Sequence, residues 1–260
     1  MGCLRAVHMK NGIDRLTGLI RQARDIVVFT GAGISTESGI ADYRGKGGRW
    51  QRFNPVTIQE FVASEDKRKE YWREKLALWE ALKDARPNEG HKAIVALEKA
   101  GRLKGLITQN IDGLHRLAGN SREKTIELHG TCLETVCLSC GDIQPWQDVY
   151  QELKRGVEAP LCAKCAGLLK PNTISFGQNL VQADLQKAFD WASDCDLLLA
   201  VGSTLVVEPA ASIPRAAKHG GAALCIITLS ETPLDPLADV KVTGPCGQTL
   251  SSVLAALVST

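Results

Sequence analysis

The chain alternates between short, uninterrupted apolar runs and longer stretches in which apolar residues recur at helical spacing. Residues 13–23 and 87–100 show the spacing of an amphipathic helix. The apolar runs are rich in β-branched residues and are followed by glycine or polar residues, as buried strands are. Because a strand that is apolar throughout is covered on both faces, the pattern predicts a parallel sheet with helices on each side. The predicted strands are 25–30, 103–108, 196–201 and 222–229.

Two segments interrupt this alternation. Residues 45–86 are charged and aromatic, and residues 131–171 hold four clustered cysteines. Both look like insertions into the sheet domain. We therefore predict an α/β fold in which a doubly wound, Rossmann-like parallel sheet domain carries a smaller inserted domain. The predicted sheet domain comprises residues 10–45, 87–130 and 171–260, the helical insert 46–86, and the cysteine module 131–170.

Composition narrows the class of protein. The 260 residues carry a formal net charge of +2, with 44% apolar and 23% charged residues, which are globular proportions. Such balanced charge argues against nucleic acid or anionic lipid as a partner. The longest apolar stretch, 197–207, is too short to cross a bilayer as a helix, and no secretory signal opens the chain. We therefore expect a cytoplasmic location and no membrane partner, and no oligomeric state follows from the sequence.

The nine cysteines are the unusual part of the composition. In a reducing compartment, clustered cysteines bind metal more often than they form disulfides. Two Cys-x-x-Cys pairs, here 21 residues apart, can place four thiolates tetrahedrally around Zn²⁺ and leave no position open for chemistry. We therefore predict one structural zinc ion, held by Cys137, Cys140, Cys162 and Cys165. Cysteines outside the pairs are expected to behave as small apolar side chains; these include Cys132, Cys195, Cys225 and Cys246.

A glycine-rich turn follows the first predicted strand. Gly31 and Gly33 would let backbone N–H groups approach a pyrophosphate. The dinucleotide pattern is incomplete, because Thr36 stands at the third glycine position. An ordinary turn from strand to helix explains these residues equally well.

Polar side chains follow the next strands. Gln109, Asn110 and Asp112 come directly after an apolar strand, where parallel sheets bind ligands, although Asn110 or Asp112 could simply cap a helix. The sequence Gly202-Ser203-Thr204 follows the third strand and could receive phosphate or ribose, or cap a helix. His129, beside Gly130, could act as a general base near neutral pH, although a single histidine is more often structural.

Together these residues resemble the sirtuins, a family of NAD-dependent protein deacylases. The resemblance extends from about residue 26 to residue 250 and is carried by segments 31–35, 42–45, 108–115 and 202–205, by His129-Gly130 and by the two Cys-x-x-Cys pairs. It implies a dinucleotide-binding domain and a smaller zinc domain that enclose a cleft. NAD would be the co-substrate, and an acyl-lysine protein or peptide would be the partner.

The resemblance also implies contacts with NAD. In the turn they would come from Gly31, Ala32, Gly33 and Ile34. Asp42, Tyr43 and Arg44 would follow, with Arg44 on the flexible cofactor loop that continues into segment 46–86. Gln109 would hold ribose, and Asn110 and Asp112 would hold the nicotinamide carboxamide. The phosphates and ribose would be contacted by Gly202, Ser203 and Thr204. Thr228, where an Asn is common, would contact the adenosine ribose, and Cys246 would lie near adenine.

His129 would be the general base of the family's reaction. The acyl oxygen attacks the nicotinamide ribose carbon and nicotinamide leaves; the base then deprotonates a ribose hydroxyl. The products are free lysine, nicotinamide and O-acyl-ADP-ribose. Segment 170–177 corresponds to the part that pairs with the substrate peptide. This chemistry needs two oriented substrates and one proton acceptor rather than a protein nucleophile.

Some positions depart from the family's pattern. Tyr43 replaces a more frequent Phe, Ser203 and Thr204 reverse the usual order of the two hydroxyl residues, and Asn172 stands where an acidic residue is usual. Sirtuins that remove succinyl groups resemble one another in a Tyr-x-x-Arg pair. In this chain Tyr71 is followed by Glu74, a carboxylate that would repel an acidic acyl chain. We therefore expect acetyl or other neutral acyl groups to be preferred.

Two other functions use the same features. An NAD glycohydrolase or ADP-ribosyltransferase could share the pocket, and a zinc-containing NAD sensor would need no catalysis. The joint presence of Gln109, Asn110, Asp112 and His129 favours deacylation.

Overall fold

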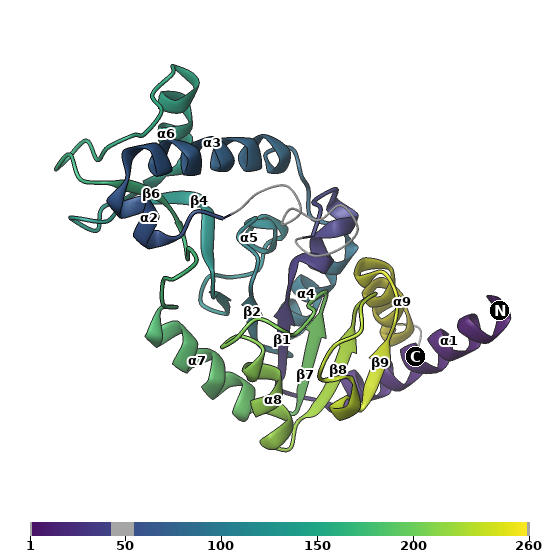
Figure 1. Ribbon diagram of the computed structural model, residues 1–260. Helices are drawn as coiled ribbons and strands as arrows, with labels where there is room; N and C mark the ends of the chain where they lie inside the picture. The colour runs from purple at the N-terminus through teal and green to yellow at the C-terminus, as the bar shows by residue number, and fades with distance from the viewer. Residues whose placement is uncertain (1, 43–54, 259–260) are drawn as a thin grey trace.

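The computed structural model describes residues 2–42 and 55–258, with α-helices and β-strands arranged in two unequal parts (Figure 1). In the larger part, six strands form one sheet in the order β3-β2-β1-β7-β8-β9, and every neighbouring pair is parallel. The strands are β1 Ile26–Thr30, β2 Leu103–Thr108, β3 Thr125–Glu127, β7 Leu197–Val201, β8 Ala223–Ile227 and β9 Val240–Val242.

The strand order reverses at β1. The chain builds outward from β1 through β2 to β3, then returns to pair β7 with the other side of β1. This confirms the predicted doubly wound α/β sheet. Because connections leave in opposite directions from β1 and β7, a crevice opens at their carboxyl ends, where such sheets bind ligands.

Helices cover both faces of the sheet (Figure 1). Side chains alternate along β1, so that Ile26 and Val28 face one apolar cluster while Val27 and Phe29 face another. The first cluster packs against α1 Gly2–Gln22, α4 Glu89–Lys99 and α9 Cys246–Val258, and the second against α7 Gln182–Ser193 and α8 Ser212–His219. Short helical turns complete this part: η1 Ala32–Ser38, α5 Leu114–Ala118 and η3 Asp235–Leu237.

The two interrupting segments fold into one smaller part. The first contributes α2 Ile58–Ala63 and α3 Glu65–Leu82. The second contributes a three-stranded antiparallel sheet in the order β5-β4-β6, together with one helix. Its elements are β4 Gly130–Cys137, β5 Ile143–Pro145, α6 Trp146–Lys154 and β6 Leu169–Thr173.

An aromatic core joins these segments. Trp72 of α3 stacks on Trp146 of α6 with ring centroids 6.0 Å apart, and Phe61 meets Tyr71 edge to face. The inserted helical and cysteine segments therefore share a core, as the predicted smaller domain requires. The domain boundaries given above stay a prediction. In residues 2–42 and 55–258, no helix combines the length and apolar character needed to cross a membrane.

Candidate functional site

Three loops meet at the carboxyl edge of the large sheet. The loop after β1 is bonded to the loop after β7, because Gly31 N–H donates to Val201 O at 3.0 Å and Gly33 N–H donates to Gly202 O at 2.8 Å. The loop after β2 joins them through Gln109, whose N–H donates to Thr30 O at 3.0 Å. The structure thus brings the three predicted stretches into one site.

Glycine is required where these loops touch. A Cβ on Gly33 would lie 2.7 Å from both Cα and O of Gly202. Gly202 has a φ of +66°, and a Cβ there would lie 2.2 Å from Ile34 N. The glycine-rich turn is therefore more than an ordinary exit from a strand, because its backbone packs directly on the backbone of a second loop.

A buried chain of hydrogen bonds links the first two loops. The Asn110 side-chain amide donates to Gly31 O at 3.2 Å and to Ser35 Oγ at 3.3 Å, and Ser35 Oγ donates to Asp112 Oδ2 at 2.7 Å. Burial raises the pKa of Asp112, although the Leu114 N–H and the Ser35 hydroxyl stabilise the carboxylate and oppose that rise. Ser35 lies in the predicted glycine-rich segment but was not predicted as a site residue. Its one signal in the sequence is a hydroxyl two residues after Gly33, and the structure shows it fully buried.

His129 stands between the sheet edge and β4. Its Nδ1 lies 2.9 Å from Gln109 O, and since a carbonyl can only accept, Nδ1 carries the proton. Burial lowers the pKa of His129, and the hydrogen bond to Gln109 opposes that change only in part. The imidazole is therefore neutral near pH 7, and the Nε2 lone pair is the one that can take up a proton. The Gln109 side chain ties the site to the third loop by donating to Ser203 Oγ at 2.9 Å.

A second buried network supports these loops from below. Thr30 Oγ1 donates to Thr108 Oγ1 at 2.8 Å and lies 3.0 Å from His115 Nε2, while the Asn110 N–H donates to Thr108 Oγ1 at 3.0 Å. Burial lowers the pKa of His115 to about 3. His115 is thus a neutral, structural residue that helps to fix the position of Asn110.

The other residues predicted near NAD fall in different places. Thr228 directly follows β8 and is buried, and its hydroxyl accepts from Ser230 N–H at 3.3 Å. Cys246 opens α9 with its thiol buried 3.6 Å from Ile227 O, and burial raises its pKa to about 12. Ala32, Ile34 and Thr204 lie within the three loops, and Asp42 is the last described residue before position 43. Tyr43 and Arg44 lie outside the described residues.

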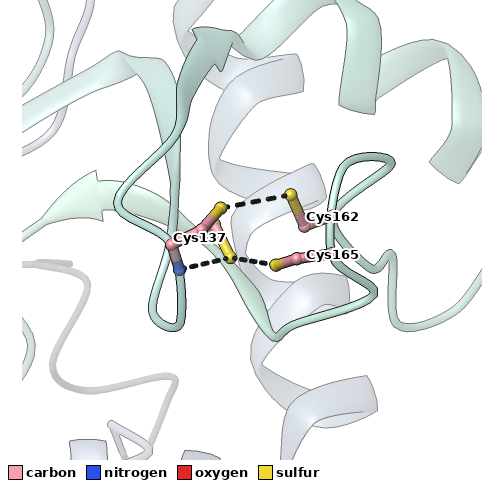
Figure 2. A group of neighbouring side chains, drawn as sticks. Cys137, Cys162 and Cys165 are labelled. Carbon is pink, nitrogen blue, oxygen red and sulfur yellow. Dashed lines mark hydrogen bonds between the residues drawn. The ribbon is translucent and has the colours of Figure 1, made fainter.

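The four paired cysteines converge in the smaller part, and Figure 2 shows Cys137, Cys162 and Cys165 of this group. Their Sγ atoms all lie within 4.8 Å of one another, with 3.5 Å between Cys137 and Cys165 and 3.8 Å between Cys140 and Cys162. These separations are far longer than a disulfide of about 2.05 Å. Four thiolates at the usual Zn–S distance of about 2.3 Å stand roughly 3.8 Å apart, so the cluster fits one tetrahedral zinc ion.

Local backbone geometry prepares this cluster for a cation. The N–H groups of Cys140 and Ser139 donate to Cys137 Sγ at 3.5 and 3.4 Å, and they lower the pKa of the Cys137 thiol to about 6. Two of the four cysteines are buried and two are exposed. As predicted, the unpaired cysteines Cys132, Cys225 and Cys246 are buried, and Cys195 is half-buried.

Comparison with known proteins agrees with this geometry. The Sir2 family model matches residues 31–209. The chain is 42% identical over 245 residues to a protein from Rhodopseudomonas palustris named NAD-dependent protein deacetylase, covering 94% of this chain and 97% of that protein. A solved Sir2 structure with p53 peptide and NAD⁺ has a TM-score of 0.86 at 35% identity and covers 95% of this chain and 99% of that one.

A further solved Sir2 variant holds deacetylated p53 peptide and 3′-O-acetyl ADP-ribose; its TM-score is 0.84 at 34% identity, covering 94% of this chain and 98% of that chain. The matched family model spans more than half of the chain, and the identity extends over nearly all of it. The chain belongs to the Sir2 family.

Proposed function

We propose that this protein removes acetyl or other neutral acyl groups from lysine side chains of proteins and consumes NAD, giving nicotinamide and O-acyl-ADP-ribose. The observation that carries the proposal is the neutral imidazole of His129, which is held by Gln109 O at the edge where the three loops meet. The names of its relatives and the ligands of solved Sir2 structures support the same reaction.

The residues of the site suit a dinucleotide. Polar side chains gather at the carboxyl edge of a parallel sheet, beside a glycine turn through which backbone can approach phosphate. Ser203 and Gln109 would orient ribose and phosphate, and Asn110 and Asp112 would hold the carboxamide. Bound NAD would supply an electrophilic ribose carbon and a leaving nicotinamide. His129 Nε2 would take up a hydroxyl proton, while the Gln109 carbonyl stabilises the resulting imidazolium through Nδ1–H.

The zinc ion supports this chemistry from a distance. All four coordination positions are taken by cysteine, so no position is left for substrate. Zinc would hold β4 and β6 against each other, and both strands lead toward His129 because Ile174 N–H donates to His129 O at 2.8 Å.

A small apolar cavity lies in the smaller part, but its volume of about 10 Å³ holds roughly one water molecule and no acyl chain. It lies between α3 and the cysteine module, where Thr173 pairs with Gly130. Its lining includes Leu78, Trp79, Ile111, Cys132, Thr173 and Lys75. Among the described residues that line it, the charged one is Lys75, whose ammonium sits 4.7 Å from the centre of the Tyr71 ring. Since the cavity cannot hold an acyl chain, the proposed preference for neutral acyl groups continues to rest on the carboxylate of Glu74 three residues after Tyr71.

The proposed function is tested by incubating the protein with NAD and an acetyl-lysine peptide and identifying the products. We expect nicotinamide and O-acetyl-ADP-ribose in equal amounts. His129→Ala should lower the rate by about 10²–10⁴-fold, the usual contribution of a general base. His219→Ala, which changes an exposed histidine, is the matched control and should leave the rate unchanged. An unaffected His129→Ala rate would overturn the assignment.

The same assay separates the alternatives. A glycohydrolase would release nicotinamide without peptide, and a sensor would bind NAD without turnover. Matched acetyl and succinyl peptides test the acyl preference through kcat/KM, and a higher value for succinyl would contradict it.

Balanced charge supports a peptide rather than nucleic acid or membrane as the partner, and the free thiols support a cytoplasmic location.

A further inference from the structure

Three buried polar side chains outside the proposed NAD contacts each leave one atom without a hydrogen bond. They are His91 on α4, His115 on α5 and Asn120, two residues after α5, and each is at most 6% exposed. Within residues 2–42 and 55–258, His91 Nε2, His115 Nδ1 and Asn120 Oδ1 have no partner. Proteins rarely leave a buried polar atom unpaired, because its lost contact with water is then not replaced. These atoms therefore point to a partner outside the protein chain.

The three side chains are neighbours. The rings of His91 and His115 have centroids 4.8 Å apart, and the Asn120 N–H donates to His115 O at 3.1 Å. Burial and His91 lower the pKa of His115, and the Asn120 side chain offsets part of this change, so its amide lies beside the ring. Asn120 Nδ2 donates to Glu98 Oε2 at 2.8 Å. The amide nitrogen is thus bound to Glu98, and Oδ1 is the atom left for the two histidines.

The hydrogen bonds of His91 determine which of its nitrogens carries the proton. Burial lowers the pKa of His91 to about 4, so the ring is neutral near pH 7 and has one N–H group. The Asn88 N–H donates to His91 Nδ1 at 3.3 Å, so Nδ1 is an acceptor. Nε2 therefore carries the hydrogen and is a donor without an acceptor.

The opposite assignment holds for the free nitrogen of His115. The Thr30 hydroxyl donates its one hydrogen to Thr108 Oγ1 at 2.8 Å, so it can only accept from His115 Nε2, which lies 3.0 Å away. The neutral ring then carries its hydrogen on Nε2, and Nδ1 is a bare acceptor. The unpaired atoms are therefore one donor, on His91, and two acceptors, on His115 and Asn120.

A single water molecule matches this set. It donates two hydrogens and accepts at least one, and buried waters typically make about three hydrogen bonds. A direct hydrogen bond between the two rings would pair only two of the three atoms and leave Asn120 Oδ1 alone. We propose that one buried water molecule binds between His91, His115 and Asn120, accepting from His91 Nε2–H and donating to His115 Nδ1 and Asn120 Oδ1.

The water extends a chain of hydrogen bonds that ends at the candidate site. His115 donates to Thr30, and both the Thr30 hydroxyl and the Asn110 N–H donate to Thr108 Oγ1. His91 is thereby linked through the water to Asn110, which makes it a positioning residue that touches no substrate. This second step rests on the proposed function, in which Asn110 holds the nicotinamide carboxamide, whereas the water site itself does not.

The water site is tested on the wild-type protein without substrate. A crystal structure that resolves ordered water should show one water within about 3.2 Å of all three atoms. Proton–nitrogen correlation spectra of the histidine rings at pH 7 should show His91 and His115 both protonated on Nε2. A direct contact between His91 Nε2 and His115 Nδ1 without water, or a His115 ring protonated on Nδ1, would overturn the proposal.

The positioning step is tested with two ligands that differ only in nicotinamide. His91→Phe removes the donor and places a larger apolar ring against the water site. We expect its Kd for NAD to rise about fivefold, the effect of roughly one hydrogen bond, while its Kd for ADP-ribose stays within twofold. His91→Gln retains an acceptor for Asn88 N–H and a donor for the water, so both Kd values should stay within twofold. His219→Phe, at an exposed position, is the matched control and should change neither.

Equal losses of affinity for NAD and ADP-ribose in His91→Phe would indicate general damage to the site and would refute the positioning role. An unchanged Kd for NAD in that variant would refute it as well. If His91→Phe does not fold, His91→Met, which also lacks a donor, must show the same difference between the ligands or the role fails. A wild type that holds the water but does not bind NAD would refute the proposed function alone, whereas one that binds NAD without the water would refute only this inference.

Discussion

The carboxyl edge of the large sheet and the cysteine module are stabilised in different ways. We call the first the nucleotide edge, because NAD is proposed to bind there, and the module comprises residues 131–170. At the nucleotide edge, β1 and β7 are buried at every position and lie in a sheet of six strands with an apolar cluster on each face. In the module, β5 has three residues with its two end positions exposed, and the core includes Cys137 and Cys162, two of the four predicted zinc ligands. A large sheet can be held by apolar burial, whereas a small unit whose ligands are also its core residues depends on its metal.

Removing the metal should produce the largest effect. Cys137→Ala deletes a ligand that is only 1% exposed and also part of the module's core. We expect zinc to be lost, the module to unfold and deacylation to fall to background, because the free energy of binding a structural zinc ion contributes directly to the free energy of folding. The six-stranded sheet should persist. Zinc content, near-ultraviolet circular dichroism for the tryptophan cluster and far-ultraviolet circular dichroism for the sheet measure these three outcomes.

Cys195→Ala is the matched control, because Cys195 is half-buried and lies outside the cluster. It should retain zinc and activity. A Cys137→Ala protein that is folded, free of zinc and fully active would show that the module is held by its apolar core alone, and the contrast with the sheet would disappear.

Crowding the nucleotide edge should have the next largest effect. In Gly33→Ala the new methyl group would meet the Gly202 backbone at 2.7 Å, so one loop must move. We expect a loss of stability of about 1–3 kcal/mol, as for overpacked cores. NAD affinity should fall at least tenfold, while zinc content stays at one ion per chain. Thermal melts and NAD titration measure the two effects.

Gly18→Ala provides the comparison, because a Cβ on Gly18 would meet nothing within 4 Å inside helix α1. That change should stabilise the protein by about 0.5–1 kcal/mol through helix propensity alone. If both alanine variants behave alike, the close contact between the loops does not constrain the site.

The sequence predicts the long, continuously apolar strands well and the three-residue strands poorly. Strand β2 was predicted at its observed bounds, and β1 and β7 within one residue, because each is a continuous apolar run between polar or glycine residues. Strands β3 and β9 were missed. Each has three residues, too few for a periodic pattern, and forms by pairing with the outer strand of the sheet already present.

The candidate site shows the same difference between local and long-range features. The loops after the long apolar strands could be predicted, but the hydrogen bonds between loops could not. Ser35 bonds to Asn110 across 75 residues, and His115 to Thr30 across 85. The acyl preference expected from Tyr71 and Glu74 stays a prediction, because the small cavity lined by Lys75 is too small to hold an acyl chain.

Mild acid should weaken the nucleotide edge through its buried histidines. The rings of His91 and His115 lie 4.8 Å apart, and burial lowers their pKa values to about 4 and about 3. Unfolded histidine titrates near 6.5, so below that pH the unfolded state binds more protons and stability falls as pH falls. Each histidine should contribute roughly 1.4 kcal/mol of loss per pH unit between about pH 6 and pH 4.

Urea unfolding from pH 7.5 to 5 measures this slope. Because acid also protonates zinc ligands, the informative quantity is the difference between the wild type and His91→Gln, in which one histidine is removed and an acceptor for the Asn88 N–H is retained. In the variant, the slope of the free energy of unfolding against pH should be smaller by about the contribution of one histidine. An unchanged slope would mean that His91 is not held neutral at the nucleotide edge.

The smallest effect should come from the surface of the cysteine module. Lys164 lies between two zinc ligands in sequence and pairs with Asp142 at 2.5 Å, but its side chain is 70% exposed. Solvent screens such a pair and both side chains lose freedom in forming it, so exposed ion pairs contribute little. Lys164→Met should therefore leave zinc content, Tm and activity indistinguishable from those of the wild type. If it instead lost zinc as Cys137→Ala does, the module would owe its stability to charges around the metal, and the distinction between a sheet held by burial and a module held by its ligands would have to be redrawn.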